Sequence, residues 1–526
     1  MASELIKQCM SKGFLLDKEV VGKLEGIGSG EINELIDLIS FLGIKERVIN
    51  LKSLLDHKEK IVSFFKGKEV SEPLRNFINF FYSLCVEVGG KSGEEKTGLV
   101  KLLQAPTFKQ RKIEVADFVQ HFRSRFESMK KILESKDFDD LTSLRKIEGS
   151  GNYTIIVSIF DKRVTKNKNI VFEVEDDLTG KRVVVANRNR KEVFEAAKSV
   201  LLDDVVAMKV SGSSEILFAN EIIYPEASLS EKRHSDFDEY VAFVSDFHAG
   251  STMFLEKNLL RFVKWLNVEE GTKAQREIAK KVKYLFIVGD NIDGINHYPG
   301  QEKYLEAFTS HDQYERVSRV LKLVRRDIQM VMCPGQHDSV WVGEPQPVIS
   351  EKWAPSLYEI PNLYLVPNPA LVEIDGGFKI LMYHGASINS FIDEMPEIRT
   401  KYGHRRPTLV VKEFLKRRHL APMHGMMDYI PCEKDSLVIE NVPDIIVTGD
   451  QHRVEVTNYN NILLIASSCW QSITPFEERV GNVPDPCKVP LFNLKTREIK
   501  ILDFSGEKEE ISDESQLKEC DLEDGC

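Results

Sequence analysis

Side chains of the types that bind divalent cations follow five apolar runs in the second half of the chain. The runs are YVAFVS, YLFIVG, IQMVMCPG, FKILMY and PDIIVTG, and the residues that follow them are Asp246 and His248, Asp290 and Asp293, Gln336, His337 and Asp338, His384, and Asp450 and His452. Carboxylate, imidazole and amide ligands together suit Mn²⁺ or Fe²⁺ better than a thiolate-bound zinc. One such segment is weak evidence, because a lone histidine is usually structural, but five in succession favour a metal centre.

The elements that must position these side chains are strands. The apolar runs alternate with helical patterns, such as those at 255–266 and 313–326, across about 236–505. Strands that alternate with helices predict an α/β sheet. Such sheets place their sites beyond the carboxyl ends of the strands. We therefore expect the five segments to converge at one edge of a sheet.

A smaller all-β domain is predicted between about 146 and 225. Its expected strands and helix are Tyr153–Ile159, Asn169–Val174, Lys181–Ala186, a helix over NRKEVFEAAKSVLL, and two final strands over DVVAMKV and SEILFANEIIY. Three strands, a helix and two strands is the order of an OB-fold, a small barrel that often binds nucleic acid. Lys162, Arg163, Lys166 and Lys168 are expected in the loop after the first strand and could follow a phosphate backbone. A protein-docking barrel with a solvated basic loop is an equally weighted alternative.

The remaining regions contain few candidates for catalytic or ligand-binding residues. Residues 1–85 have apolar residues at helical spacing and predict a small helical domain. Residues 86–145 predict a linker followed by a polar helical segment. Residues 506–526 hold nine acidic residues against two lysines, which is a net charge of −7 out of −11 for the chain. Such a tail is typical of a disordered, solvated segment.

Composition favours a protein of a reducing compartment. The eight cysteines are scattered and include no C-x-x-C pair, which argues against a zinc finger or a disulfide framework and favours the cytosol. The sequence MASELIKQCM lacks the apolar core of a signal peptide. No apolar run approaches the roughly 18 residues that a membrane span needs, so no membrane is expected.

The five polar segments resemble the motifs of the calcineurin-like metallophosphoesterase superfamily, which are D-x-H, G-D-x-x-D, G-N-H-D/E, a further His, and G-H-x-H. The resemblance implies an α/β phosphoesterase sandwich over 236–505 that holds two divalent cations, with Mn²⁺ favoured and Mg²⁺ or Fe²⁺ as alternatives. Two cations about 3.5–4 Å apart neutralise the charge of a phosphate and supply a hydroxide at neutral pH. Its implied ligands are Asp246, His248 and His452 for the first cation, Asp290 as the bridge, and Gln336, His384 and Asp450 for the second.

The same resemblance assigns supporting roles and exposes two departures. His337 would act as a general acid or stabilise the transition state, Asp338 would orient it, and Asp293 would support the ligands from behind. The family usually has Asn at position 336 and His at position 450, and both changes fall on the second cation. We expect a second site shifted toward Mn²⁺ or Mg²⁺, and a site that has decayed is the alternative.

Longer stretches narrow the resemblance. GDNIDGINHYPGQ, KRRHLAP, EKDSLVIENVPDIIVTGDQHR and CWQSITPFEERVGNVPDPCKVPL are similar to the small subunits of archaeal family-D DNA polymerases, over about 146–495. That family implies an OB-fold and a phosphoesterase domain in one chain, with 3′→5′ proofreading exonuclease activity on single-stranded DNA or a primer 3′ end. It also implies a heterodimer with a large catalytic subunit, and a cytoplasmic, nucleoid-associated place in an archaeal cell.

Two other functions remain open at this point. A scaffold subunit would hold the large subunit without cleaving DNA, as the related small subunits of eukaryotic replicative polymerases have lost most of these ligands. The retained set at 246, 248, 290, 337, 384 and 452 favours the enzyme. A small-molecule or protein phosphatase would use the same metals, and the predicted barrel argues against it.

Overall fold

The computed structural model describes residues 99–506 except 107, 109–111 and 177–180, together with isolated earlier positions and residues 512–513. The chain divides into two compact units, Met1–Gly93 and Glu94–Cys526. In the first unit the two-residue strands β1 (Leu15–Leu16) and β2 (Val48–Ile49) pair in parallel. Apart from such isolated positions, the predicted helical domain of 1–85 lies outside the described residues, as does most of the acidic tail.

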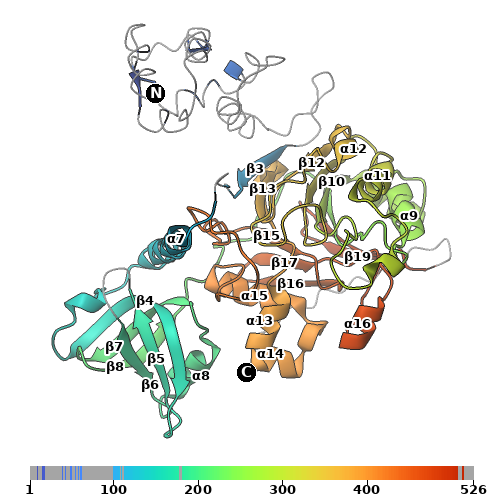
Figure 1. The fold of residues 1–526 in the computed structure, drawn as a ribbon. Coiled ribbons are helices and arrows are strands. Elements are labelled where there is room, and N and C mark those ends of the chain that lie inside the picture. The colour runs from blue at the N-terminus through green and yellow to red at the C-terminus, as the bar shows by residue number, and fades with distance from the viewer. Residues whose placement is uncertain are drawn as a thin grey trace. The chain divides into compact units, whose positions relative to one another are not determined.

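Two β-sheets, covered by helices, form the part of the chain that carries the polar segments (Figure 1). The larger sheet has the order β12-β11-β10-β9-β18-β19-β20, with β9 to β12 parallel and the last three strands antiparallel to their neighbours. Its strands are β9 (Tyr240–Val244), β10 (Val282–Val288), β11 (Gln329–Cys333), β12 (Leu363–Leu365), β18 (Lys488–Asn493), β19 (Ile499–Asp503) and β20 (Ser512–Asp513). The strand β20 lies in the tail that was predicted to be disordered.

The smaller sheet has the order β16-β17-β15-β14-β13-β3. Its strands are β3 (Val100–Gln104), β13 (Ala370–Ile374), β14 (Phe378–Met382), β15 (Ile445–Thr448), β16 (Glu455–Tyr459) and β17 (Ile462–Ala466). The strands β14, β15 and β17 run parallel. Their carboxyl ends therefore meet at one edge.

Alternation along the strands explains why the two sheets stack. On β9, Val241 and Phe243 join the core between the sheets, while Ala242 and Val244 face the helices, as the two-residue period of a strand requires. The larger sheet is covered by α9 (Glu256–Leu266), α10 (Lys273–Lys280), α11 (Ser310–Leu321) and α12 (Pro355–Tyr358), and the smaller by α13 (Ile388–Glu394) and α15 (Pro407–Arg417). The short helices are α14 (Pro396–Lys401), α16 (Pro475–Val480), η1 (Leu144–Lys146), η2 (Gln301–Tyr304), η3 (Asp375–Gly377) and η4 (Gly403–Arg405).

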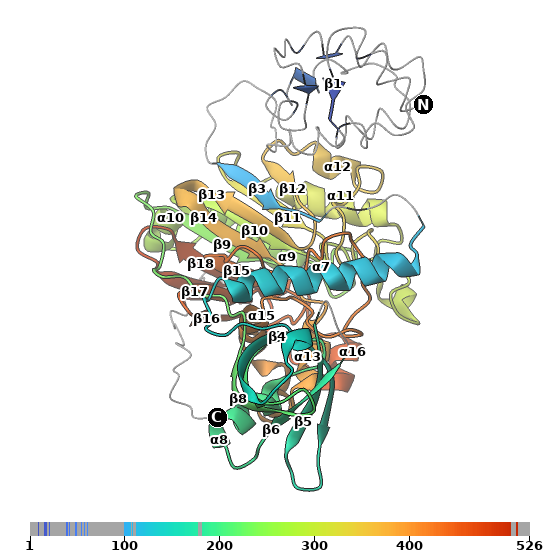
Figure 2. The same ribbon diagram turned by 90° about the vertical axis from the view of Figure 1, so that its left-hand side faces the viewer.

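The predicted all-β domain is a closed five-stranded barrel with the order β4-β5-β6-β8-β7; its strands are visible in Figure 2. Its elements are β4 (Gly151–Val164), β5 (Ile170–Glu175), β6 (Arg182–Ala186), α8 (Lys191–Ser199), β7 (Val205–Gly212) and β8 (Leu217–Ile223). Three strands, a helix and two strands follow one another as expected, and the assignment to the OB-fold stays a prediction.

The region 86–145 differs from its prediction as a linker and helical segment alone. The helix is α7 (Val115–Glu134), but β3 precedes it and pairs antiparallel with β13 as an edge of the smaller sheet. The buried guanidinium of Arg125 on α7 donates to Asp435 at 2.7 Å, and the same carboxylate lies 3.0 Å from Nε2 of His419. Within the described residues, none of the helices combines the length and the apolar character that a membrane crossing needs.

Candidate metal centre

The polar segments that follow the strands have an unusual backbone. Five of their residues adopt left-handed φ angles, namely Asp246 (53°), His248 (48°), Asp290 (46°), Asp450 (64°) and His452 (54°). This conformation costs a non-glycine residue on the order of 1–3 kcal/mol and persists only where the surroundings fix it. Its concentration at adjacent strand ends is typical of a functional site, because the turns direct these side chains toward one another.

Two glycines leave the space into which the ligands fit. Gly289 has a φ of 78°, and a Cβ at this position would collide with Nδ1 of His384. A Cβ at Gly449 would lie 2.7 Å from Oδ2 of Asp246. Glycine is therefore required directly after β10 and β15, because a larger residue would displace His384 or Asp246, which follow other strands.

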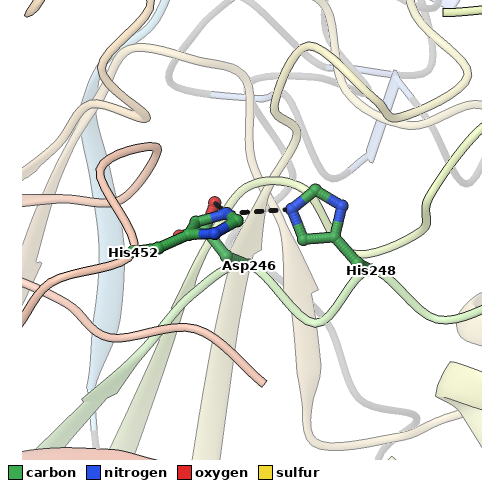
Figure 3. A group of neighbouring side chains, drawn as sticks. All are labelled: Asp246, His248 and His452. Carbon is green, nitrogen blue, oxygen red and sulfur yellow. Dashed lines mark hydrogen bonds and ion pairs between the residues drawn. The ribbon is translucent and has the colours of Figure 1, made fainter. Parts of the chain in front are cut away.

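The first group of ligand atoms joins residues from β9 and β15 (Figure 3). Asp246, His248 and His452 each offer one atom, and these three atoms lie within 4.8 Å of one another. Nε2 of His452 is 3.6 Å from Oδ1 of Asp246 and 3.1 Å from Nε2 of His248. Two imidazole nitrogens and a carboxylate that converge in this way can bind one divalent cation.

The second group shares a residue with the first. Asp246, Asp290 and His384 also place one atom each within 4.8 Å of one another. Nε2 of His384 is 3.2 Å from Oδ2 of Asp290 and 4.0 Å from Oδ1 of Asp246. Burial alone would lower the pKa of His384, but the surrounding carboxylates raise it well above its usual value. The pocket is therefore strongly negative, which favours a cation.

The hydrogen bonds of His384 and Gln336 test whether a cation fits. Nδ1 of His384 donates to the backbone oxygen of Val288 at 2.9 Å, so Nε2 is the nitrogen that a cation would bind in place of a proton. This Nε2 atom and Oε1 of Gln336 are buried and have no well-oriented hydrogen bond from any described residue. Buried polar atoms are rarely left in this state, so both atoms fit as cation ligands.

His337 is half-buried and lies beside the first group. Its Nδ1 donates to the backbone oxygen of Asp293 at 2.7 Å, and its backbone N–H donates to Oδ1 of Asp290 at 2.8 Å. Its ring contacts that of His248 edge-on, with centroids 4.9 Å apart. The carboxylate of Asp293 lies 3.3 Å from Nδ1 of His248. Asp293 thus supports both histidines, one through its backbone and one through its side chain.

Asp338 does not make the contact expected of it. Its carboxylate accepts hydrogen bonds from the side chains of Tyr314 and Asn291 and from the backbone N–H of Gly335. Burial raises its pKa to about 6. The prediction that Asp338 orients His337 is therefore corrected, because the carboxylate is directed toward α11 and ties it to the loop after β11, while Asp293 orients the histidine.

Asp450 lies at the margin of the second group. Its backbone N–H donates to Asp246 at 3.1 Å, and its Oδ2 accepts from Gln451 at 2.7 Å and from Asn389 at 3.2 Å. Burial raises its pKa, with the charge of Asp246 acting in the same direction and that of His384 opposing it. The structure therefore places Asp450 next to the second group without including its carboxylate in the set of mutually close atoms.

Comparison with known proteins gives the family. Residues 241–457 match the family of DNA polymerase alpha/epsilon B-subunits. The DNA polymerase II small subunit of Methanothermobacter thermautotrophicus is 39% identical over 74% of this chain and 80% of its own length. The chain belongs to the archaeal DNA polymerase II small-subunit family. The small subunit of Pyrococcus furiosus is 37% identical over 76% of this chain and 65% of its own length.

Solved structures add a more distant likeness. A phosphoesterase from E. coli is 14% identical, with a TM-score of 0.26, and spans 52% of this chain and 98% of its own. No argument rests on a likeness at this TM-score. The sequence relatives alone place the chain among the small subunits of family-D DNA polymerases and confirm the resemblance drawn from the longer stretches.

One supporting residue of this small subunit was not predicted from the sequence. Oε1 of Glu477 lies 2.9 Å from Nδ1 of His452, and Oε2 accepts from the backbone N–H of Thr474 at 2.9 Å. Burial would raise the pKa of Glu477, but the hydrogen bond and charge of His452 lower it. The T-x-x-E pattern of 474–477 predicts a helix start, but nothing local indicates that the second oxygen reaches a residue 25 positions away.

The basic side chains of the barrel are placed differently from the prediction. The strand β4 extends to Val164, so Lys162 and Arg163 lie on this strand instead of in the loop after it. Nζ of Lys162 donates to the backbone oxygens of Lys198 and Val200, each at 2.7 Å. This lysine therefore caps the end of α8, whereas Arg163, Lys166 and Lys168 are exposed.

Proposed function

We propose that this chain is the 3′→5′ exonuclease subunit of a heterodimeric archaeal replicative DNA polymerase. The observation that carries the proposal is the pair of three-residue groups that share Asp246. A decayed scaffold subunit would have no reason to keep both groups, their strained backbone and their glycine spaces. The name of the relatives, DNA polymerase II small subunit, supports a large subunit as the partner. The archaeal cytoplasm is proposed as the location.

The donor set supports two divalent cations, with Mn²⁺ favoured and Mg²⁺ or Fe²⁺ as the alternatives. Asp246, His248 and His452 would hold one, and Asp246, Asp290 and His384 the other, with Gln336 and Asp450 as further ligands of the second cation. When bound, such a pair neutralises phosphate charge and supplies a hydroxide at neutral pH.

His337 is proposed as the general acid. Since its Nδ1–H is committed to the carbonyl of Asp293, its Nε2 is the nitrogen that can carry a proton to the substrate. The oxygen of the attacking water bonds to the terminal phosphorus, the bond from phosphorus to the 3′ oxygen of the preceding nucleotide breaks, and that oxygen takes the proton. The products are a nucleoside 5′-monophosphate and a shortened strand with a 3′ hydroxyl.

The substrate is proposed to be a single-stranded or frayed 3′ end. Mismatched termini separate more easily than matched ones, which would give selectivity to an enzyme that takes melted ends. The exposed side chains of Arg163, Lys166 and Lys168 on the β4–β5 hairpin of the barrel are proposed to contact the phosphates of the same strand.

The test is hydrolysis of a single strand by the purified chain, with and without its large subunit, in Mn²⁺. The nucleotide lost first identifies the direction, so a label on the 3′-terminal nucleotide must be released before one at the 5′ end. Asp290→Ala and His337→Ala should abolish release, while His311→Ala, which changes an exposed histidine on α11, should not. Release that is absent in the parent, or equal in all variants, would refute the exonuclease.

A further inference from the structure

A histidine outside the predicted ligand set lies against the proposed general acid. The ring of His297 stacks on that of His337, with centroids 4.5 Å apart and planes inclined by 22°. His297 is nevertheless exposed. One side of its ring is therefore covered by His337, and the ring remains reachable from solvent.

The loop between β10 and η2 fixes this ring in place. Gly294 has a φ of 71°, and a Cβ there would collide with Nε2 of His297, so only glycine lets the ring fold back. The buried side chain of Gln301 accepts from the backbone N–H of His297 at 2.9 Å and donates to the backbone oxygen of Asp293 at 2.9 Å. The backbone of the loop therefore determines where His297 lies.

Two further side chains of the loop are left partly open to solvent. Ile295 and Tyr298 are each 37% exposed. They belong to the same loop as His297, whose ring stacks on the residue that would protonate the leaving oxygen. Aromatic rings at the mouth of a nucleic-acid site stack on unpaired bases of any sequence.

We propose that the open face of His297, with Tyr298 beside it, seats the unpaired base of the 3′-terminal nucleotide. The inference rests on the proposed function, because it is the phosphate of that same nucleotide that must lie next to His337. A base can stack on His297 only after it has left its partner strand. The loop would therefore make recognition of a frayed end part of substrate binding.

Binding is tested first, with a readout that does not need cleavage. An oligonucleotide with 2-aminopurine as its 3′-terminal base is titrated with protein in Ca²⁺, and stacking on an aromatic ring quenches its fluorescence. We expect quenching with the parent, His297→Phe and His311→Ala, and loss of most of it with His297→Ala. Equal quenching by the parent and His297→Ala overturns the proposal, whether or not the protein is a nuclease.

Kinetic measurements then distinguish two roles for His297, namely stacking on the terminal base and positioning of His337. On a strand with a normal 3′-terminal base, His297→Ala should lower kcat/KM about tenfold, mainly through KM, as expected for one lost stacking contact. On a strand whose terminal nucleotide is abasic, and on bis(p-nitrophenyl) phosphate, the parent and His297→Ala should be equal. An equal loss on all three substrates would show that His297 acts through His337 and would overturn the base seat.

Discussion

Glu477→Ala offers a sharp test of how the first cation site is built. Glu477 is 6% exposed and makes two contacts, one with His452 and one with the cap of α16. Loss of a carboxylate that orients a metal-bound histidine typically lowers metal affinity 10- to 100-fold. Loss of a helix cap costs about 1 kcal/mol of stability.

The two effects are separated by variants at the same turn. Thr474→Ala removes a capping group and leaves the contact with His452, so it should lower stability without changing Mn²⁺ affinity. Glu477→Gln has one carbonyl oxygen for two N–H groups, so it should fall between the parent and Glu477→Ala. Calorimetric Mn²⁺ titration measures the affinities, and urea unfolding measures the stabilities.

The expected result is that Glu477→Ala binds one of two Mn²⁺ ions 10- to 100-fold more weakly. The reasoning would be refuted if Glu477→Ala and Thr474→Ala had the same Mn²⁺ affinities. In that case the carboxylate would act only as a helix cap.

Three further predictions concern acid stability, ligand space and charge. Burial lowers the pKa of His419 to about 4, whereas an unfolded histidine has a pKa near 6.5. Below pH 6.5 the unfolded chain therefore binds more protons than the folded chain, and the free energy of unfolding decreases as the pH is lowered. Between pH 7 and pH 5 the parent should lose about 2 kcal/mol more than His419→Gln in urea unfolding, and equal losses would contradict this. Gly289→Ala should displace His384 and reduce the bound Mn²⁺ from two ions to one with unchanged circular dichroism; two bound ions would show that the space is not needed. Asp450→Asn removes a charge beside the second group and should weaken one Mn²⁺ ion roughly tenfold in calorimetry, whereas unchanged affinity would limit Asp450 to its hydrogen bonds.

Most of the site could be predicted from local sequence patterns, namely the apolar runs of the strands and the polar residues that directly follow them. The apolar runs before Asp246 and Asp290 are parallel neighbours in the larger sheet, so their carboxyl ends meet. The prediction of a single sheet was wrong, because the run before His384 is a strand of the smaller sheet. The closed barrel was equally accessible, because its strands and helix are consecutive in the chain. The edge strand β3 was missed, since its five residues pair with β13 about 270 positions later, and nothing local signals such pairing.

Side-chain orientation is the other part that the sequence could not supply. Asp338 follows His337 directly, yet its carboxylate bonds to Tyr314 on α11. The oxygen of Glu477 reaches His452 from a separate helix. Lys162 is one of four basic residues close together, and only the length of β4 shows that it caps α8. Each of these contacts depends on where a distant element packs.

The central claim is that the two groups sharing Asp246 bind a pair of cations. Anomalous diffraction from crystals of this chain grown with Mn²⁺ tests it most directly. The account predicts two peaks, about 3.5–4 Å apart, one beside His248 and His452 and the other beside His384. A single peak, or two peaks that leave either group empty, would contradict it.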